Sequence, residues 1–274
     1  MNENSNKEPE KVREGKAFWK RRTPYAIGIL AVIASLALVS FVLDIRKEND
    51  EKQDANMEEQ EKILTVYGER TKEELVEELK HTIVQIQAEI PSVDGKTDLL
   101  TGSGVILTIT DGYVDIVTAS HVVESTAAPL VFFADGSLAY GSVLAYGKES
   151  DIAFVRVTKE NFAEGIGTQL QAVKCEDVEG YTGLIREEEV LYIGSASGVA
   201  EDVKTGILTD KEQFVELFQN DMLVCSANVS GGMSGCGTFH RTGSLIGILV
   251  GTNGKEAVSV AVPDVTAEYR SVSQ

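Results

Sequence analysis

The chain has 274 residues, 43% of them hydrophobic, and a formal net charge of −18 at pH 7. This apolar content suffices for a packed core and excludes a wholly disordered chain, and the length allows one large domain or two small ones. Residues 1–23 hold seven Lys or Arg against four Glu, so the acidic excess lies in the remainder. A body that acidic repels phosphate backbones, which argues against nucleic-acid binding.

Residues 24–43, PYAIGILAVIASLALVSFVL, contain no charged side chain. About 20 apolar residues in a helix span a hydrocarbon core of roughly 30 Å, so the run predicts one transmembrane helix. A cleaved signal peptide is the alternative, but its apolar region is shorter, about 7–15 residues, and ends at a small-x-small cleavage site. The run is preceded by the basic residues Lys16, Lys20, Arg21 and Arg22. The positive-inside rule therefore predicts a single-pass protein of the cell membrane, with residues 1–23 in the cytoplasm and residues 44–274 outside.

Residues 44–70 are polar and strongly acidic, with no sustained apolar period. This composition predicts a solvated stalk, and a short coiled coil is the alternative. Thr71 then opens the sequence T-K-E-E, a capping-box pattern that Glu74 completes. Because apolar residues follow at helical spacing, we predict a short amphipathic helix over 72–81.

After this helix the pattern changes to short β-branched runs separated by glycine, which predicts strands. The runs are residues 82–90, 102–109, 113–119, 130–134, 141–147, 152–157, 190–195, 203–209, 222–227, 244–251 and 257–262. Many short strands with few helices are typical of an all-β sandwich or barrel. The length of 71–274 suits two packed six-stranded β-barrels, and we predict one domain over these residues.

Three segments carry residue types that together perform nucleophilic catalysis. His121 directly follows an apolar strand in V-T-A-S-H-V-V, and Asp151 directly precedes one in S-D-I-A-F-V-R-V. Ser234 lies in the glycine-rich turn S-G-G-M-S-G-C-G. A serine hydroxyl needs a base within hydrogen-bond reach, which His121 would supply, and Asp151 would hold the imidazole in the right tautomer. The sequence therefore predicts a Ser-His-Asp triad.

The glycines around Ser234 suggest a second function for this turn. Two backbone N–H groups that point inward from a tight turn form an oxyanion hole, and side chains there would obstruct it. The expected donors are the amides of Gly232 and Ser234. Two other ionisable residues, Asp115 within a strand and His240 in a hairpin turn, are predicted to face solvent instead of joining the site.

The order and spacing of several segments resemble the HtrA/Deg-type branch of the trypsin-like serine proteases. T-G-S-G-V-I-L is similar to the opening strand of that family, and V-T-A-S-H-V-V to its histidine motif. Asp151-Ile-Ala-Phe-Val matches the aspartate motif, and the residues from Ala227 to Gly235 resemble the serine motif. G-S-L-I-G-I and V-S-V-A-V-P resemble two later segments. The resemblance runs from about Leu75 to Val265.

Some positions depart from the pattern of the family. Met233 replaces the usual Asn or Asp before the serine, Cys236-Gly237 replaces Gly-Pro, and Gly231 stands where proline is typical. About a dozen residues follow Val262-Pro263, too few for the C-terminal PDZ module of the family, so regulation through such a module is not expected to carry over. These departures leave room for an alternative, a catalytically silent or signal-gated protease fold that serves as a surface binding or sensing module.

The resemblance implies a chymotrypsin-like double β-barrel that cleaves peptide bonds through an acyl-enzyme, without a metal or other cofactor. Its substrates would be proteins or peptides, and its task would be protein quality control or regulated processing. The primary pocket in the family implies Asn228, Val229, Leu249 and Val250 as lining residues. No charged residue stands among them, which favours a small or aliphatic residue before the cleaved bond. Trimers are common in the family, but no particular residue here supports one.

The three cysteines, Cys175, Cys225 and Cys236, show no C-x-x-C spacing, so a structural zinc site is not expected. An odd number cannot pair fully within one chain. A bridge between Cys225 and Cys236 requires Cα atoms within about 6 Å of each other, a distance that the sequence leaves open.

Overall fold

A computed structural model describes residue 47 and residues 70–91, 97–147 and 150–273. The predicted cytoplasmic tail 1–23, the predicted transmembrane helix 24–43 and nearly all of the predicted stalk 44–70 lie outside these residues. The described protease-like region falls within one compact unit, Ile63–Gln274. Within the described ranges, every helix is too short or too polar to cross a bilayer.

The first helix of this unit is α2 (Lys72–Leu79), followed by the short 3-10 helix η1 (Lys80–Thr82). The predicted capping box is present: the Thr71 hydroxyl accepts from the Glu74 N–H at 3.2 Å, and the Glu74 carboxylate accepts from the Thr71 N–H at 2.9 Å. Leu75 and Leu79 are buried, so the apolar side of the helix packs on the core as the spacing predicts.

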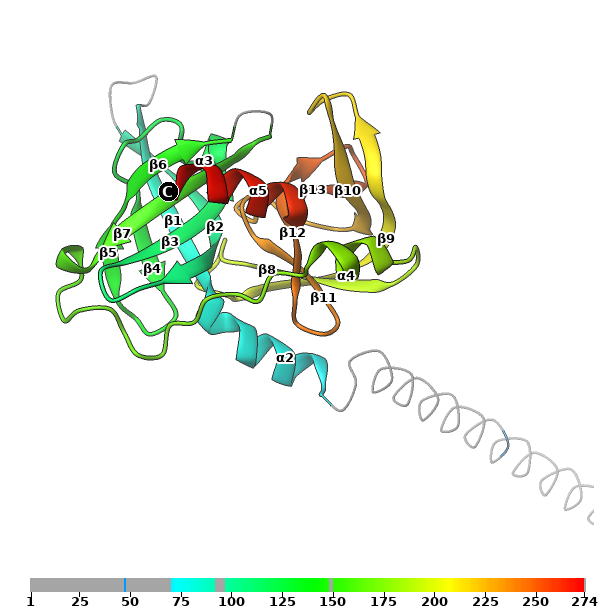
Figure 1. Ribbon diagram of the computed structural model, residues 1–274, viewed down its shortest axis with the longest axis horizontal. Coiled ribbons are helices and arrows are strands. Elements are labelled where there is room, and N and C mark those ends of the chain that lie inside the picture. The colour runs from blue at the N-terminus through cyan, green and yellow to red at the C-terminus, as the bar shows by residue number, and fades with distance from the viewer. Residues whose placement is uncertain (1–46, 48–69, 92–96, 148–149, 274) are drawn as a thin grey trace, which may run out of the picture. The chain divides into compact units, whose positions relative to one another are not determined.

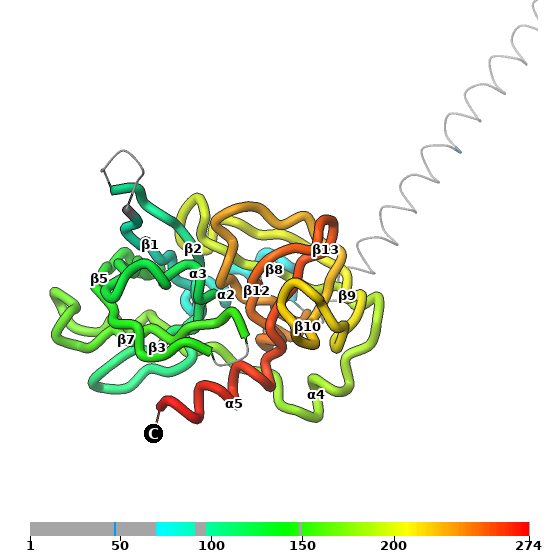
Figure 2. The backbone as a smooth tube through the Cα atoms, turned by 90° about the horizontal axis from the view of Figure 1, so that it is seen from above, coloured from blue at the N-terminus to red at the C-terminus, as the bar shows by residue number. Residues whose placement is uncertain are grey.

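The N-terminal part of the unit is a sheet of seven antiparallel strands in the order β5-β4-β1-β2-β3-β7-β6, which we call the half-barrel. Its strands are β1 (Ile83–Pro91), β2 (Thr97–Ile109), β3 (Tyr113–Ala119), β4 (Leu130–Phe133), β5 (Leu138–Tyr140), β6 (Ser142–Tyr146) and β7 (Ile152–Thr158). Short helical turns follow β3 and β7, namely α3 (Ser120–Val123) and η2 (Lys159–Asn161). The sheet curls back on itself, as Figure 2 shows.

The prediction of a closed six-stranded barrel is wrong for this half. Its two edge strands, β5 and β6, are consecutive in the chain and are joined by Gly141 alone. A hairpin needs a loop of about two residues or more, so β5 and β6 cannot pair with each other and close the ladder. A Cβ at Gly141 would lie 2.5 Å from Val155, so this corner between the two edges has no room for a side chain.

The C-terminal part is a closed barrel of six strands in the order β10-β13-β12-β11-β8-β9, as predicted for this half. Its strands are β8 (Glu189–Gly194), β9 (Asp202–Val215), β10 (Asn220–Ala227), β11 (Gly237–His240), β12 (Leu245–Thr252) and β13 (Glu256–Ala261). The structure thus has an all-β chymotrypsin-like architecture with one closed barrel and one half-barrel (Figure 1).

Two helices accompany the barrel, α4 (Val178–Gly183) and α5 (Val262–Val272). The strand pattern predicts a last strand that ends at 262, with no helix after it. A signal for α5 is nevertheless present, because Pro263 suits the first turn of a helix and Val262, Val265, Tyr269 and Val272 recur at helical spacing. Two of these residues, Val262 and Val265, are fully buried.

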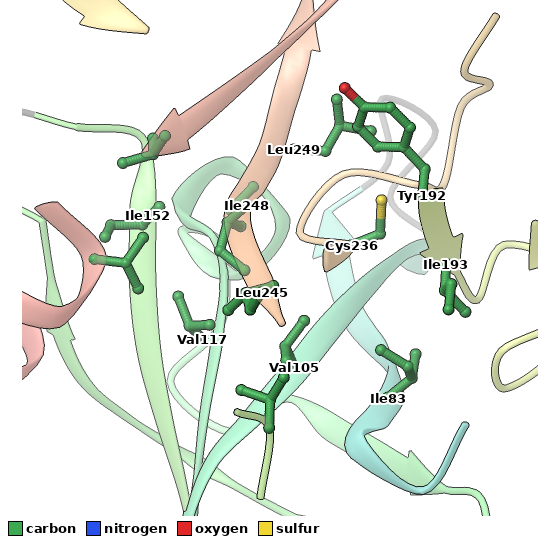
Figure 3. Close-up of a cluster of buried hydrophobic side chains, with 14 of the residues drawn as sticks. Ile83, Val105, Val117, Ile152, Tyr192, Ile193, Cys236, Leu245, Ile248 and Leu249 are labelled. Carbon is green, nitrogen blue, oxygen red and sulfur yellow. The ribbon is translucent and has the colours of Figure 1, made fainter. Parts of the chain in front are cut away.

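The two halves share one continuous hydrophobic core. Figure 3 shows part of it, where Val105, Val117 and Ile152 of the half-barrel face residues of the closed barrel such as Leu245 and Ile248. All five side chains are 0% exposed. Because dense apolar packing resists deformation, this shared core holds the two halves in a fixed relation.

Asp115 is not on the surface, which corrects the sequence interpretation. Its side chain is 1% exposed and binds the Arg156 guanidinium through two hydrogen bonds of 2.7 Å. The Tyr269 hydroxyl of α5 donates to the same carboxylate at 2.6 Å, and burial together with this bond raises the pKa of Tyr269 to about 12. Asp115 departs from the alternation of buried apolar and exposed polar residues that the strand predicts, because a charge that is fully paired and hydrogen-bonded can be buried.

His240 is the second residue that the sequence wrongly placed in solvent. It ends β11, its side chain is only 12% exposed, and its Nδ1 lies 2.9 Å from the Thr242 hydroxyl. Burial lowers its pKa below the ordinary value, so the imidazole is kept neutral. Like Asp115, it has no hydrogen bond to the triad residues in the part of the chain that the structure describes.

We expect Asp115→Ala to lower the free energy of unfolding by about 3 kcal/mol, because it leaves the half-buried Arg156 charge without its anionic partner. Urea denaturation of the full-length protein measures this loss. The control is Asp111→Ala, an exposed turn residue whose replacement should change stability by less than about 0.5 kcal/mol. Equal stabilities of the two variants would contradict a structural role for the buried ion pair.

Candidate active site

The fold brings His121 and Asp151 to the same end of two neighbouring strands. β3 and β7 are antiparallel, and Ala119 at the end of β3 pairs with Ile152 at the start of β7. A residue just after β3 and a residue just before β7 must therefore meet. The Ser120 N–H donates to the Asp151 carbonyl at 3.1 Å, which extends the ladder by one step to these two positions.

The Asp151 carboxylate holds the His121 ring at its Nδ1 atom. His121 Nδ1 lies 2.6 Å from Asp151 Oδ2, and the His121 N–H donates to Oδ1 at 3.2 Å. The Ser120 hydroxyl also donates to Oδ1, so both carboxylate oxygens have partners. With Nδ1 engaged, the tautomer with its proton on Nδ1 is favoured and Nε2 is left as the basic atom.

The ionised forms of His121 and Asp151 stabilise each other. The hydrogen bond to Asp151 raises the pKa of His121 above 6.5, against an opposing effect of burial. Burial alone would raise the pKa of Asp151, but the hydrogen bonds from His121 and Ser120 outweigh it, and the pKa of this carboxyl is lowered. The pair is thus arranged to stabilise an imidazolium that forms when His121 accepts a proton.

Ser234 lies in a tight loop between β10 and β11. Two hydrogen bonds define the loop: the Met233 N–H donates to the Ser230 carbonyl at 3.2 Å, and the Cys236 N–H donates to the Met233 carbonyl at 2.9 Å. Gly232 and Gly235 both have φ of +85°, a conformation that residues with a Cβ rarely adopt. Both glycines therefore suit a backbone path that residues with a side chain rarely follow.

The Ser234 loop packs directly against the end of the half-barrel that carries His121. The Ser103 N–H donates to the Ser234 carbonyl at 2.8 Å. A Cβ at Gly235 would lie 2.1 Å from the Ser103 carbonyl oxygen and 3.0 Å from the Ala119 nitrogen, two residues before His121. Within the described residues, however, no hydrogen bond joins the Ser234 hydroxyl to the His121 ring.

The two expected oxyanion donors are the amides of Gly232 and Ser234. In the described part of the chain, neither N–H donates a hydrogen bond to any protein group. The carbonyl groups around them, by contrast, are bonded: Gly232 and Ser234 to Ser103, and Met233 to Cys236. A preformed oxyanion hole requires amides that make no hydrogen bond within the protein, in a loop whose carbonyl groups are held by hydrogen bonds.

The residues expected to line the primary pocket lie on either side of this loop. The Leu249 N–H donates to the Cys236 carbonyl at 2.9 Å, and the Leu249 carbonyl accepts from the Gly235 N–H at 2.7 Å. Leu249 and Val250 are nearly fully buried, at 2% and 3% exposure. Val229 is half-buried and Asn228 is exposed. Their role in binding a substrate side chain stays a prediction.

The three cysteine thiols are unreactive as nucleophiles near neutral pH. All three are free thiols. Burial raises the pKa of Cys175 and of Cys225 to about 11, and burial also raises the pKa of Cys236. A thiol with such a pKa is a poor nucleophile near neutral pH. Across the described ranges, the His, Cys, Asp and Glu side chains form no group suited to hold a metal ion.

Two serines near the site were missed by sequence reasoning. Ser120 directly precedes His121 in the sequence, and the structure makes it a hydrogen-bond donor to Asp151. Ser103 was part of a strand motif, and its contacts to the nucleophile loop were not foreseen. The proximity of Ser120 to His121 was a usable signal, but contacts of Ser103 depend on how the two halves pack, which no local pattern encodes.

The half-barrel, the closed barrel and a His–Asp pair beside a glycine-rich serine loop define a chymotrypsin-like protease architecture. The family model described as "Trypsin-like peptidase domain" matches residues 102–248, more than half of the chain. The chain therefore belongs to the trypsin-like peptidase family.

Several curated relatives of the chain are named as HtrA-like serine proteases. The chain is 24% identical to "Serine protease HtrA-like" of Staphylococcus aureus strains MRSA252 and MSSA476, over 96% of this chain and 36% of each relative. It is 28% identical to the protein of the same name from strain USA300, over 59% of this chain and 22% of the relative. The chain spans about a third of the length of the relatives from strains MRSA252 and MSSA476.

We expect an NMR titration of the full-length protein to give His121 a pKa above 6.5, and Asp151→Asn to lower this pKa. The substitution removes the negative charge and one of the two carboxylate acceptor oxygens beside His121, while burial, which lowers the pKa, remains. His240 is an internal control, because burial keeps its pKa below 6.5 in both proteins. A His121 pKa that does not change on substitution would contradict the observed pairing.

Proposed function

We propose that the chain is a membrane-anchored, extracytoplasmic serine endopeptidase with the triad Ser234, His121 and Asp151. The observation that carries the proposal is the 2.6 Å contact between His121 Nδ1 and Asp151 Oδ2. This contact lies at the end of the half-barrel against which the Ser234 loop packs. An oriented base beside a serine in a glycine-rich turn is the arrangement that activates a hydroxyl nucleophile.

The reaction proceeds in two halves. The Ser234 hydroxyl attacks the carbonyl carbon of the substrate while His121 Nε2 accepts its proton, and the resulting oxyanion accepts hydrogen bonds from the Gly232 and Ser234 amides. His121 then gives the proton to the leaving amine, and an acyl-enzyme remains on Ser234. Water attacks this ester with His121 again as base, which releases the acid and restores the serine. No step calls for a cofactor.

One observation supports a second candidate, a catalytically silent or signal-gated binding module on the same fold. In the described residues the Ser234 hydroxyl and the His121 ring are not hydrogen-bonded. Such bonds are often long in proteins without substrate and tighten on binding, so activity remains the first proposal. The two candidates differ in whether Ser234 reacts with an electrophile faster than other serines do.

We expect a fluorophosphonate probe to label the full-length protein at Ser234. Labelling should disappear in Ser234→Ala and fall by more than about 10³-fold in His121→Ala, because the general base is lost. Ser230→Ala is the matched control, since it removes an exposed hydroxyl from the same loop and should label normally. A folded protein that does not label would favour the silent module.

The cellular setting is part of the proposal. Residues 24–43 would anchor the chain in the cell membrane, with residues 1–23 in the cytoplasm and the protease domain outside. Proteins or peptides at the cell surface would be the substrates, in quality control or regulated processing, and the uncharged pocket residues favour small or aliphatic side chains before the cleaved bond. The apolar run itself supports the anchor, because its length matches the bilayer core.

We expect the full-length protein to stay in the membrane pellet after alkaline carbonate extraction, and a variant without residues 24–43 to move to the soluble fraction. Protease added to intact cells should digest the described domain but spare the first 23 residues. A tag placed before residue 24 reports the second result. Release of the full-length chain by carbonate, or protection of the protease domain, would contradict the proposed topology.

A further inference from the structure

Ser103 connects the half-barrel to the catalytic loops of the closed barrel. It lies on β2, is 0% exposed, and belongs to none of the predicted catalytic groups. Its N–H donates to the Ser234 carbonyl at 2.8 Å, and its hydroxyl donates to the Gly232 carbonyl at 3.1 Å. The same hydroxyl oxygen accepts from the Ser195 N–H at 2.8 Å. One buried serine thus binds three backbone groups outside its own sheet.

The hydroxyl of Ser103 joins two neighbouring loops of the closed barrel by direct hydrogen bonds. Ser195 follows β8, whereas Gly232 belongs to the nucleophile loop after β10. The two loops touch closely, because a Cβ at Gly232 would lie 2.6 Å from the Ala196 side chain. Since the hydroxyl accepts from one loop and donates to the other, both of its hydrogen-bonding functions are used.

The bond to the Gly232 carbonyl acts on a flexible part of the backbone. Gly231 and Gly232 are adjacent, and neither has a side chain that restricts its dihedral angles. Gly231 is exposed, and among the described residues a Cβ there would meet nothing within 4 Å. The path of the chain at Gly232 is therefore set by hydrogen bonds and not by side-chain packing at Gly231.

The position of Ser103 is itself fixed from the His121 side of the site. Its carbonyl accepts from the Thr118 hydroxyl of β3 at 2.7 Å, three residues before His121. A rigid path therefore runs from β3, which leads to His121, through Ser103 to Gly232 and Ser234. Each link is a hydrogen bond between buried or partly buried groups, where loss of a partner is costly.

We propose that Ser103 is a positioning residue for peptide-bond hydrolysis: its hydroxyl holds the Gly232 carbonyl, and with it the Gly232–Met233 peptide plane, which lies between the Gly232 and Ser234 amides that would bind the oxyanion. The inference rests on the proposed function of Ser234. Ser103 does not touch the reacting atoms and acts through the two residues that do. Its hydroxyl should matter for the chemical step and not for the first reversible binding of a ligand.

The test measures the reaction of a fluorophosphonate with the full-length protein over a range of probe concentrations, which separates kinact from KI. We expect Ser103→Ala to lower kinact by roughly 10- to 100-fold, because Gly232 and Ser195 each lose a buried partner. KI should stay unchanged, since binding of the probe before reaction does not use the oxyanion hole. Ser103→Cys fills the same space with a weaker donor and should give an intermediate kinact.

Ser259→Ala is the matched control. Ser259 is also 0% exposed, and its hydroxyl lies 2.9 Å from the Thr238 hydroxyl within the closed barrel. This variant also loses a buried hydrogen bond of a serine hydroxyl, so its stability should fall while kinact stays at the wild-type value. The comparison separates a positioning role of Ser103 from a general effect on the fold.

Three outcomes would overturn the inference. If the wild-type protein reacts and Ser103→Ala keeps the wild-type kinact, Ser103 has no positioning role and the proposed function stands. If Ser103→Ala does not fold, a wild-type kinact in Ser103→Cys excludes the positioning role in the same way. If the folded wild-type protein does not react at all, the proposed function fails first and the inference falls with it.

Discussion

The arrangement of the candidate site depends on the contact between β2 and the Ser234 loop. His121 and Asp151 come from the half-barrel and Ser234 from the closed barrel, so no local segment can bring the three together. The 2.8 Å hydrogen bond from the Ser103 N–H to the Ser234 carbonyl holds the Ser234 loop against the half-barrel. Gly235 makes this approach possible, because a Cβ there would lie only 2.1 Å from the Ser103 carbonyl oxygen.

A second contact between the halves lies along α5. This helix leaves the closed barrel after β13 and reaches the half-barrel, where Tyr269 donates to Asp115 and its ring packs 5.5 Å from that of Phe154 (Figure 1). The preceding residue of the helix, Glu268, accepts from the Ser150 hydroxyl at 2.6 Å, directly before Asp151. The buried charge of Asp115 therefore orients the C-terminal helix, and that helix in turn supports the segment that carries Asp151.

Much of the fold could be predicted because its signals are local. The capping box at Thr71 and the strand at 113–119 need only neighbouring residues, and the structure has both as predicted. His121 after one strand and Asp151 before another were also informative, because antiparallel pairing brings such positions together. Closure of the N-terminal half was predicted wrongly, since it depends on the single residue Gly141 between two edge strands.

What the sequence could not provide were the contacts made across the fold. Asp115 alternates with apolar residues as a surface residue would, and only the position of Arg156 and Tyr269 beside it explains its burial. Ser103 and Ser120 have no periodicity that marks them, because their partners lie in other segments. Motifs therefore pointed to the candidate catalytic residues, whereas the groups that hold them in place became visible only in three dimensions.

The most direct test of the account is a crystal structure of the full-length protein after reaction with a phosphonate. We predict a covalent bond to Ser234 Oγ, with the phosphonyl oxygen within about 3 Å of both the Gly232 and the Ser234 nitrogen atoms and the Ser103 hydroxyl still bonded to the Gly232 carbonyl. An adduct on another residue, or a Gly231–Gly232 peptide turned so that its N–H points away from the phosphonyl oxygen, would contradict it.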